Sequence, residues 1–63
     1  MDFSSIILNL KDYHNNCRRR IWDHGVYIYE KDKMIYMHGL DNVDRIFELK
    51  TEDILADDWV VKL

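Results

Sequence analysis

The chain has only 63 residues, and this shortness constrains its fold more than any other feature. A folded protein of this mass exposes about 4,300 Å² where the unfolded chain exposes about 11,000 Å², so roughly three fifths of the surface can be buried. Ligand pockets usually occupy ~300–1,000 Å³, which a core this small can hardly enclose. We therefore expect a single domain over residues 1–63, with any ligand pocket between subunits of a homo-oligomer, either a dimer or a tetramer.

Composition excludes several classes of protein. The chain is 48% hydrophobic and 33% charged without proline, which favours a folded domain over disorder. Nine Lys and Arg against twelve Asp and Glu give a net charge of −3, so we expect neither a nucleic acid polymer nor a membrane as partner. No apolar run approaches the ~18 residues that span a bilayer, and one cysteine cannot form an internal disulfide. These features predict a cytoplasmic protein.

The first segment has the periodicity of an amphipathic helix. Four apolar residues recur at the i, i+3, i+4 and i+7 spacing of one helix face: Phe3, Ile6, Ile7 and Leu10. Asp2 can cap the first turn, and Asn15 and Asn16 tolerate the left-handed backbone that ends a helix. The spacing predicts a helix from residue 3 to about residue 14.

The remainder is rich in β-branched and aromatic residues separated by short turns. Five segments have strand character: 17–22, 26–30, 34–38, 43–49 and 59–63. The first four predict an antiparallel meander, and residues 51–56 begin with a cap residue and two acids typical of a short helix. We expect an α+β fold: an N-terminal helix, then a four- to five-stranded antiparallel sheet with a short helix before the last strand. The predicted core is Phe3, Ile6, Ile7, Leu10, Ile28, Leu55 and Trp59.

The sequence contains no recognisable catalytic or metal-binding motif. It has no nucleophile elbow, P-loop, GxGxxG or HExxH pattern. Cys17 lies three residues after His14, a spacing that could pair a thiolate with a base, although a small buried cysteine is the commoner situation. His24 and His38 lie in other segments, so ligands for zinc do not converge. We expect no enzymatic activity, no cofactor and no metal.

Three consecutive arginines are the sharpest local charge feature. In a strand, Arg18 and Arg20 share a face with Trp22, whereas Arg19 points to the other face. Guanidinium groups bind phosphates, and Trp22 and Tyr27 offer aromatic platforms for a nucleobase. We expect one arginine to contact a ligand and another to hold an acid near the C-terminus. The alternative is that these are edge-strand charges paired with acids: Asp23, Glu30 or Asp44.

The run Asp57-Asp58-Trp59 near the C-terminus adds the remaining candidates. Asp58 can accept a ribose hydroxyl or instead cap a turn or pair with an arginine, and Trp59 can serve as the core anchor of the last strand. A nucleotide needs phosphate donors, aromatic platforms and hydroxyl acceptors. The candidate ligand-binding residues that supply all three are Arg19, Arg20, Trp22, Asp23, Tyr27, Asp58 and Trp59.

Two of these segments resemble a known family. The run Arg-Arg-Ile-Trp-Asp-His-Gly at 19–25 and the box Asp-Ile-Leu-Ala-Asp-Asp-Trp at 53–59 resemble the second Thoeris anti-defence family. Members of that family are small phage proteins with an Arg-x-Gly-Trp-Asn-Gly turn and a terminal Asp-Leu-Leu-Ala-x-Asp-Trp box. This chain departs from the pattern at Ile21, where the family has Gly, and at Phe47, where a further Trp is usual. Its central segment is also shortened to a tight turn.

The resemblance implies a molecular sponge. Such a protein is a homo-oligomer, typically of four subunits, which sequesters a cyclic nucleotide immune signal without cleaving it. The implied ligand is a cyclic ADP-ribose isomer or a cyclic di- or oligonucleotide, bound in the host cytoplasm during phage infection. A competing hypothesis is a protein–protein inhibitor that mimics a polyanion with an acidic surface: Asp41, Asp44, Glu48, Asp57 and Asp58. A specific RNA or DNA binder ranks third among these hypotheses. One arginine-rich strand falls short of the basic stripe expected of such a protein.

Overall fold

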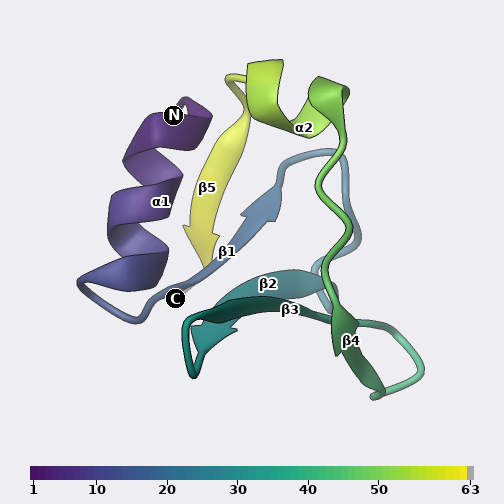
Figure 1. Cartoon of the computed structure of the whole chain (residues 1–63). Coiled ribbons are helices and arrows are strands. Elements are labelled where there is room, and N and C mark those ends of the chain that lie inside the picture. The colour runs from purple at the N-terminus through teal and green to yellow at the C-terminus, as the bar shows by residue number, and fades with distance from the viewer. Residues whose placement is uncertain (63) are drawn as a thin grey trace.

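The computed structural model describes residues 1–62, which form two helices and five strands (Figure 1). In chain order the elements are α1 (Phe3–Lys11), β1 (Asn16–Arg19), β2 (Tyr27–Lys31), β3 (Met34–His38), β4 (Asp44–Ile46), α2 (Thr51–Leu55) and β5 (Trp59–Lys62). The predicted α+β fold, with its short helix before the last strand, is confirmed. Leu63, which we expected to end that strand, lies outside the described residues.

The strands form one antiparallel sheet in the order β4-β3-β2-β1-β5. The first four strands are the predicted meander, and the last strand returns to pair with the first, with Cys17 opposite both Ile28 and Val61. Figure 1 shows the sheet strongly twisted, with the β1–β5 pair above and the β2–β3 hairpin below. The two chain segments that carry the family resemblance therefore meet side by side at the β1–β5 end of the sheet.

Helix α1 begins and ends on identifiable backbone signals. The Asp2 carboxylate accepts a hydrogen bond from the Ser5 backbone N–H at 3.0 Å, as predicted for an N-cap. The helix ends at Lys11, three residues before the predicted end. His14 has a φ of 53°, a left-handed conformation that reverses the chain, and the Asn15 backbone N–H then bonds to the Asn9 carbonyl at 3.0 Å. The reversal at His14 explains the shorter helix.

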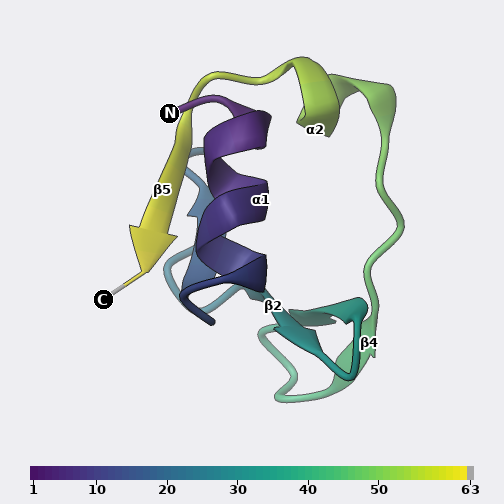
Figure 2. The ribbon, with the colours of Figure 1, turned by 60° about the vertical axis from the view of Figure 1, so that its left-hand side comes forward.

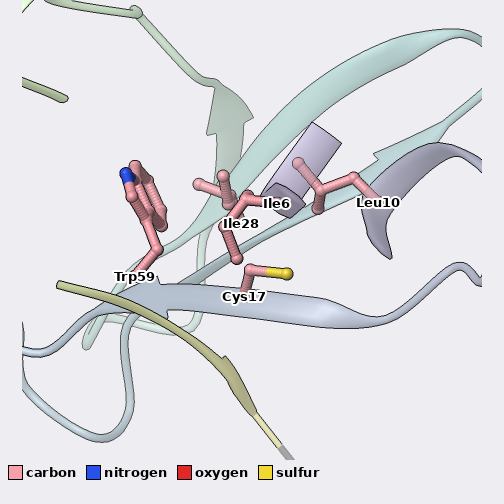
Figure 3. Packing of buried hydrophobic residues seen from close by; sticks show 5 residues of the cluster. All are labelled: Ile6, Leu10, Cys17, Ile28 and Trp59. Carbon is pink, nitrogen blue, oxygen red and sulfur yellow. The ribbon is translucent and has the colours of Figure 1, made fainter. Parts of the chain in front are cut away.

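The core lies between α1 and the β1–β2–β5 part of the sheet (Figure 3). Five side chains are essentially inaccessible to solvent: Ile6, Leu10, Cys17, Ile28 and Trp59. The predicted core residue Phe3 packs on this cluster, its ring centroid 5.5 Å from that of Trp59. Two other predictions are wrong, since Ile7 is 38% exposed and Leu55 is 78% exposed. Helix α2 has only five residues, and the side that it buries carries Asp53, so Leu55 stays exposed.

The connection between β1 and β2 is longer than the sequence suggested. We expected a strand to Trp22, but β1 ends at Arg19, and the Trp22 backbone N–H closes a turn onto the Arg19 carbonyl at 3.0 Å. The Arg18 guanidinium holds this turn, because its Nη1 donates to the carbonyls of Arg19 and Trp22 at 3.1 and 3.2 Å. Strand alternation therefore does not place Arg20 with Trp22, and that part of the prediction is wrong.

The two faces of the sheet differ in character. Ile28 and Cys17 face α1, so the alternate residues of the β2–β3 hairpin form the opposite, outer face: Tyr27, Tyr29, Tyr36 and His38. On the inner face α1 packs mainly against β1 and β5, and Figure 2 shows it beside those strands, with α2 above. Ile35 and Met37 of β3 consequently remain only half-buried. Among residues 1–62, no helix has the length and apolar character needed to cross a membrane.

Candidate functional site

Arg19 makes the most buried ion pairs in the part of the chain that the structure describes. Its Nε donates to Asp58 Oδ1 at 2.6 Å and its Nη1 to Asp53 Oδ1 at 3.0 Å, with the three side chains 13%, 25% and 8% exposed. The hydrogen bond from Arg19 lowers the pKa of Asp58, and the same bond raises the pKa of Arg19. The expectation that one arginine holds an acid near the C-terminus is therefore confirmed for Arg19.

Trp59 lies directly behind this ion-pair cluster. Its indole Nε1–H donates to the Asp53 carbonyl at 2.9 Å, and its side chain is 0% exposed. A completely buried ring is a core anchor, one of the two roles that the sequence left open for Trp59. Arg19, Asp58 and Trp59 thus join β1, α2 and β5 into one unit.

Trp22 is half-buried, so solvent reaches part of its ring. Its ring meets Trp59 edge-on, with centroids 5.3 Å apart at 81°, and meets Phe47 at 5.9 Å and 70°. The turn that follows β1 places Trp22 there, because the Trp22 N–H bonds back to Arg19. Trp22 and Phe47 are half-buried and form the aromatic wall of a hollow of about 290 Å³, which we call the Trp22 cleft.

Charged groups of both signs line the Trp22 cleft. Its cationic groups are Arg45 and Lys50, and its acidic groups are Glu48, Glu52 and Asp53. Arg45 Nη2 donates to Asp41 Oδ2 at 2.7 Å, and this bond lowers the pKa of Asp41 to about 2. Lys50 makes no ion pair within residues 1–62. The cleft therefore combines aromatic edges, a free ammonium group and carboxylates.

The other predicted site residues lie outside the cleft. Arg20 is exposed on the turn after β1, where its backbone N–H donates to the Asp58 carbonyl at 3.0 Å, and Asp23 is exposed on the same turn. Tyr27 is on the outer face of the sheet, stacked on His38 with centroids 4.9 Å apart, and Lys62 Nζ lies 5.0 Å from its ring. The structure thus separates Tyr27 from Trp22, which the sequence grouped together.

A second hollow lies on this outer face, outside the predicted site. It occupies about 320 Å³ and is lined by Arg18, His24, Val60, Val61 and Lys62. Arg18 Nη2 lies 3.3 Å from His24 Nδ1, and Arg18 Nη1 donates to backbone carbonyls of the turn. The two cations of this hollow already have contacts within the chain. Arg18 bonds to the carbonyls of the turn, and Lys62 lies over the Tyr27 ring.

Sequence reasoning missed Arg45, Phe47 and Lys50 as site residues. The alternation of residues 43–49 was a usable signal, because it places Arg45 and Phe47 on the same face of a strand. The close approach of Trp22 to that strand had no signal in the sequence, since it depends on how the sheet twists. Within residues 1–62, no group of three or more His, Cys, Asp or Glu side chains is placed to hold a metal ion.

The structure is a small α+β protein in which β1, α2 and β5 meet at an Arg–Asp–Trp cluster beside the Trp22 cleft. A family model, the Thoeris anti-defense 2-like domain, matches residues 1–62. The chain belongs to this family, which gives it a role in Thoeris anti-defence and phage immune evasion. A search of curated proteins returned no match.

Proposed function

We propose that the chain is a sponge, which binds a cyclic nucleotide immune signal in the host cytoplasm without cleaving it. The observation that carries this proposal is the Trp22 cleft, where a half-buried indole, a second aromatic ring and the ammonium group of Lys50 lie together. The ligand class is a cyclic ADP-ribose isomer or a cyclic di- or oligonucleotide. The Thoeris anti-defence family supports this choice of ligand class.

Each part of such a ligand has a complementary group in the cleft. Trp22 and Phe47 offer ring surface to a base, and a base stacked on an aromatic side chain contributes about 1–3 kcal/mol. Lys50 and Arg45 can donate charge-assisted hydrogen bonds to phosphates. Glu52 and its acidic neighbours can accept hydrogen bonds from ribose hydroxyls. These are groups for affinity, and the proposal includes no catalytic step.

The size of the cleft supports a homo-oligomer. The Trp22 cleft occupies about 290 Å³, at the lower end of the usual ~300–1,000 Å³ for ligand pockets, and it is partly open to solvent. Many large apolar side chains are also exposed on the single chain, Ile7, Ile54 and Leu55 among them. A second copy would cover such residues and enlarge the pocket, so we propose a dimer or tetramer with intersubunit pockets.

The acidic-inhibitor hypothesis has less support from the geometry. Asp41 pairs with Arg45, Asp44 Oδ1 lies 2.6 Å from His38 Nδ1, and Asp58 pairs with Arg19. Three of the five acids of that hypothetical surface are thus bonded to basic side chains of the same chain. A polyanion mimic needs free negative charge, which this pairing reduces.

The test is a thermal-shift and calorimetric panel of cyclic ADP-ribose isomers and cyclic dinucleotides. A ligand at one hundred times its Kd adds about 2.7 kcal/mol of stability, which raises the Tm of a domain this small by roughly 10–20 °C. Mass spectrometry of the ligand released by heating should return it unchanged. No shift with any member of the panel, or recovery of a cleaved product, would contradict the proposal.

Variants locate the binding site. Trp22→Ala should weaken binding by about 1–3 kcal/mol, and Lys50→Gln should weaken it about tenfold if Lys50 meets a phosphate. Tyr36→Ala is the matched control, because Tyr36 is a half-buried aromatic residue on the outer face. If Tyr36→Ala weakens binding as much as Trp22→Ala does, the Trp22 cleft is not the site. Arg20, Asp23 and Tyr27 remain predicted contacts that the same calorimetry can test.

A further inference from the structure

The side chain of Arg18 lines the hollow on the outer face of the sheet, yet it bonds to the backbone that carries Trp22. Its Nη1 donates to the carbonyls of Arg19 and Trp22 at 3.1 and 3.2 Å, and a longer contact of 3.4 Å joins it to the Arg20 carbonyl. The Trp22 N–H also donates to the Arg19 carbonyl at 3.0 Å. Three carbonyls of one short turn therefore converge on a single guanidinium nitrogen.

No carboxylate explains the position of Arg18. It is half-buried, and it makes no ion pair within residues 1–62. Its side-chain partner is His24, whose Nδ1 lies 3.3 Å from Arg18 Nη2 and acts as the acceptor, because a guanidinium group only donates. Both terminal nitrogens of Arg18 are thus directed at the segment 19–24. Bonds from a charged donor are stronger than those between neutral groups, so this arginine is well suited to fix that segment.

The turn decides where the Trp22 ring can lie. The ring itself is held by edge-on contacts with Trp59 and Phe47, at centroid separations of 5.3 and 5.9 Å. Aromatic pairs occur over separations of about 4.5–7 Å, so these contacts leave the ring some freedom. The carbonyl bonds from Arg18 fix the backbone from which the ring projects. Placement of the ring in the cleft therefore depends on a residue whose own side chain lies outside the cleft.

We infer that Arg18 is a positioning residue for the Trp22 cleft, which fixes the turn 19–22 from the outer face and so holds Trp22 where a ligand meets it. The inference rests on the proposed function for what the cleft binds, whereas the placement of Trp22 is a property of the chain without ligand. A ring that is already in place loses less affinity to ordering when the ligand binds. Arg18 thus contributes to affinity without touching the ligand.

Hydrogen exchange of the Trp22 backbone amide in the ligand-free chain measures how often the turn opens, because this N–H closes the turn. Arg18→Met removes the charged donors, and the amide should then exchange roughly 10- to 100-fold faster. The indole N–H of Trp59, bonded to the Asp53 carbonyl, is the internal reference. A loss of global stability would accelerate both protons by one factor, whereas loss of positioning accelerates the Trp22 amide far more.

Two variants sharpen this measurement. Lys62→Met is the matched control, because it removes the other cation of the outer hollow, which lies over Tyr27, and should leave the Trp22 amide unchanged. Arg18→Lys keeps a cation but cannot reach the turn and His24 together, so its amide should exchange at an intermediate rate. The inference is overturned if the Trp22 amide exchanges equally fast in the natural chain and in Arg18→Met. If Arg18→Met does not fold, an unchanged rate in Arg18→Lys overturns it.

Binding is measured with the cyclic nucleotide of the panel that raises the Tm of the natural chain most. The Kd should rise about tenfold in Arg18→Met where the closed turn falls to about a tenth of the molecules, and Lys62→Met should bind as the natural chain does. In Trp22→Ala, the added Arg18→Met should weaken binding no further, because the side chain that Arg18 positions is gone. Fully additive losses would show that Arg18 does not act through Trp22.

The outcomes separate this inference from the proposed function. If the natural chain binds no cyclic nucleotide but Arg18→Met accelerates exchange at Trp22 alone, the sponge is contradicted and the positioning of Trp22 stands. If the natural chain binds one and Arg18→Met binds it equally well despite faster exchange at Trp22, the sponge stands and the role of Arg18 in affinity is overturned.

Discussion

The ion pairs of Arg19 offer the sharpest test of how this small fold is held together. Arg19→Met keeps most of the side-chain volume but removes the charge that Asp53 and Asp58 face at 3.0 and 2.6 Å. Asp53 would then be a carboxylate that is 8% exposed with no cation beside it. Removing one partner of a buried pair costs about 3–5 kcal/mol, and we expect about 3 kcal/mol here because Asp58 keeps some contact with water.

That loss is large relative to the stability available. Native domains are stable by about 0.05–0.15 kcal/mol per residue, so a chain of 63 residues has roughly 3–9 kcal/mol. Arg19→Met should therefore be partly or wholly unfolded at 25 °C. Urea titrations followed by circular dichroism measure the effect. Every variant is compared at one protein concentration, because the proposed self-association would make the midpoint concentration-dependent.

Two further variants decide whether the reasoning about charge is correct. Arg45→Met removes an arginine whose pair with Asp41 is exposed, 59% and 51% for the two side chains, and it should leave the urea midpoint almost unchanged. Adding Asp53→Asn to Arg19→Met removes the uncompensated charge and should recover much of the lost stability. The reasoning is wrong if Arg45→Met costs as much as Arg19→Met, or if Asp53→Asn makes Arg19→Met still less stable.

Three other expectations follow from burial and titration. Ile6→Ala should lower the free energy of unfolding by about 2–5 kcal/mol, whereas Leu55→Ala should change it little, as urea midpoints would show. Burial raises the pKa of the Cys17 thiol to about 11, so a thiol reagent at pH 8 should react with Cys17 only as fast as the chain unfolds. Arg19 lowers the pKa of Asp58, so the stability from this pair is present above the ordinary pKa of 3.8 and is lost as pH falls below it; Asp58→Asn should flatten the acid limb of a plot of stability against pH.

The pattern of elements could be predicted because local signals agree with one another. The capping Asp2, the apolar stripe of α1 and the short polar turns between β-branched segments each act within a few residues. The errors arose where distant packing decides. Ile7 fits the helix stripe as well as Ile6 does, but α1 packs on only half of the inner face, and nothing within the helix says which half.

The candidate site was harder to predict for the same reason. Trp22 was chosen by assuming that β1 continues to it, yet Trp22 lies in a turn that Arg18 holds through backbone carbonyls. Phe47 and Lys50 are 25 and 28 residues further along the chain, and only the folded sheet brings them to the cleft. Charge and aromatic type identified the chemistry, and tertiary structure decided which residues supply it.

The two motifs that carry the family resemblance contact each other in this structure. Arg19 and Trp22 of the first lie against Asp53, Asp58 and Trp59 of the second through two ion pairs and an edge-on aromatic contact. Trp22 and Asp53 of these motifs line the Trp22 cleft, and the ion pairs of Arg19 hold β1 to the C-terminal segment, which is a requirement of the fold whatever the ligand.

The residues that would select a ligand lie elsewhere. Arg45, Phe47 and Lys50 line the same cleft, but they belong to β4 and the segment after it, outside both motifs. Exchange of the ring at Phe47, or of the charge at Lys50, changes what faces the ligand while leaving the Arg19 cluster intact. Under the proposed function, such an exchange would change the ligand without loss of either motif. Phe47→Trp should then alter which cyclic nucleotide this chain prefers while changing its urea midpoint little. A ligand preference that is the same in Phe47→Trp and the natural chain would show that selection depends on other residues.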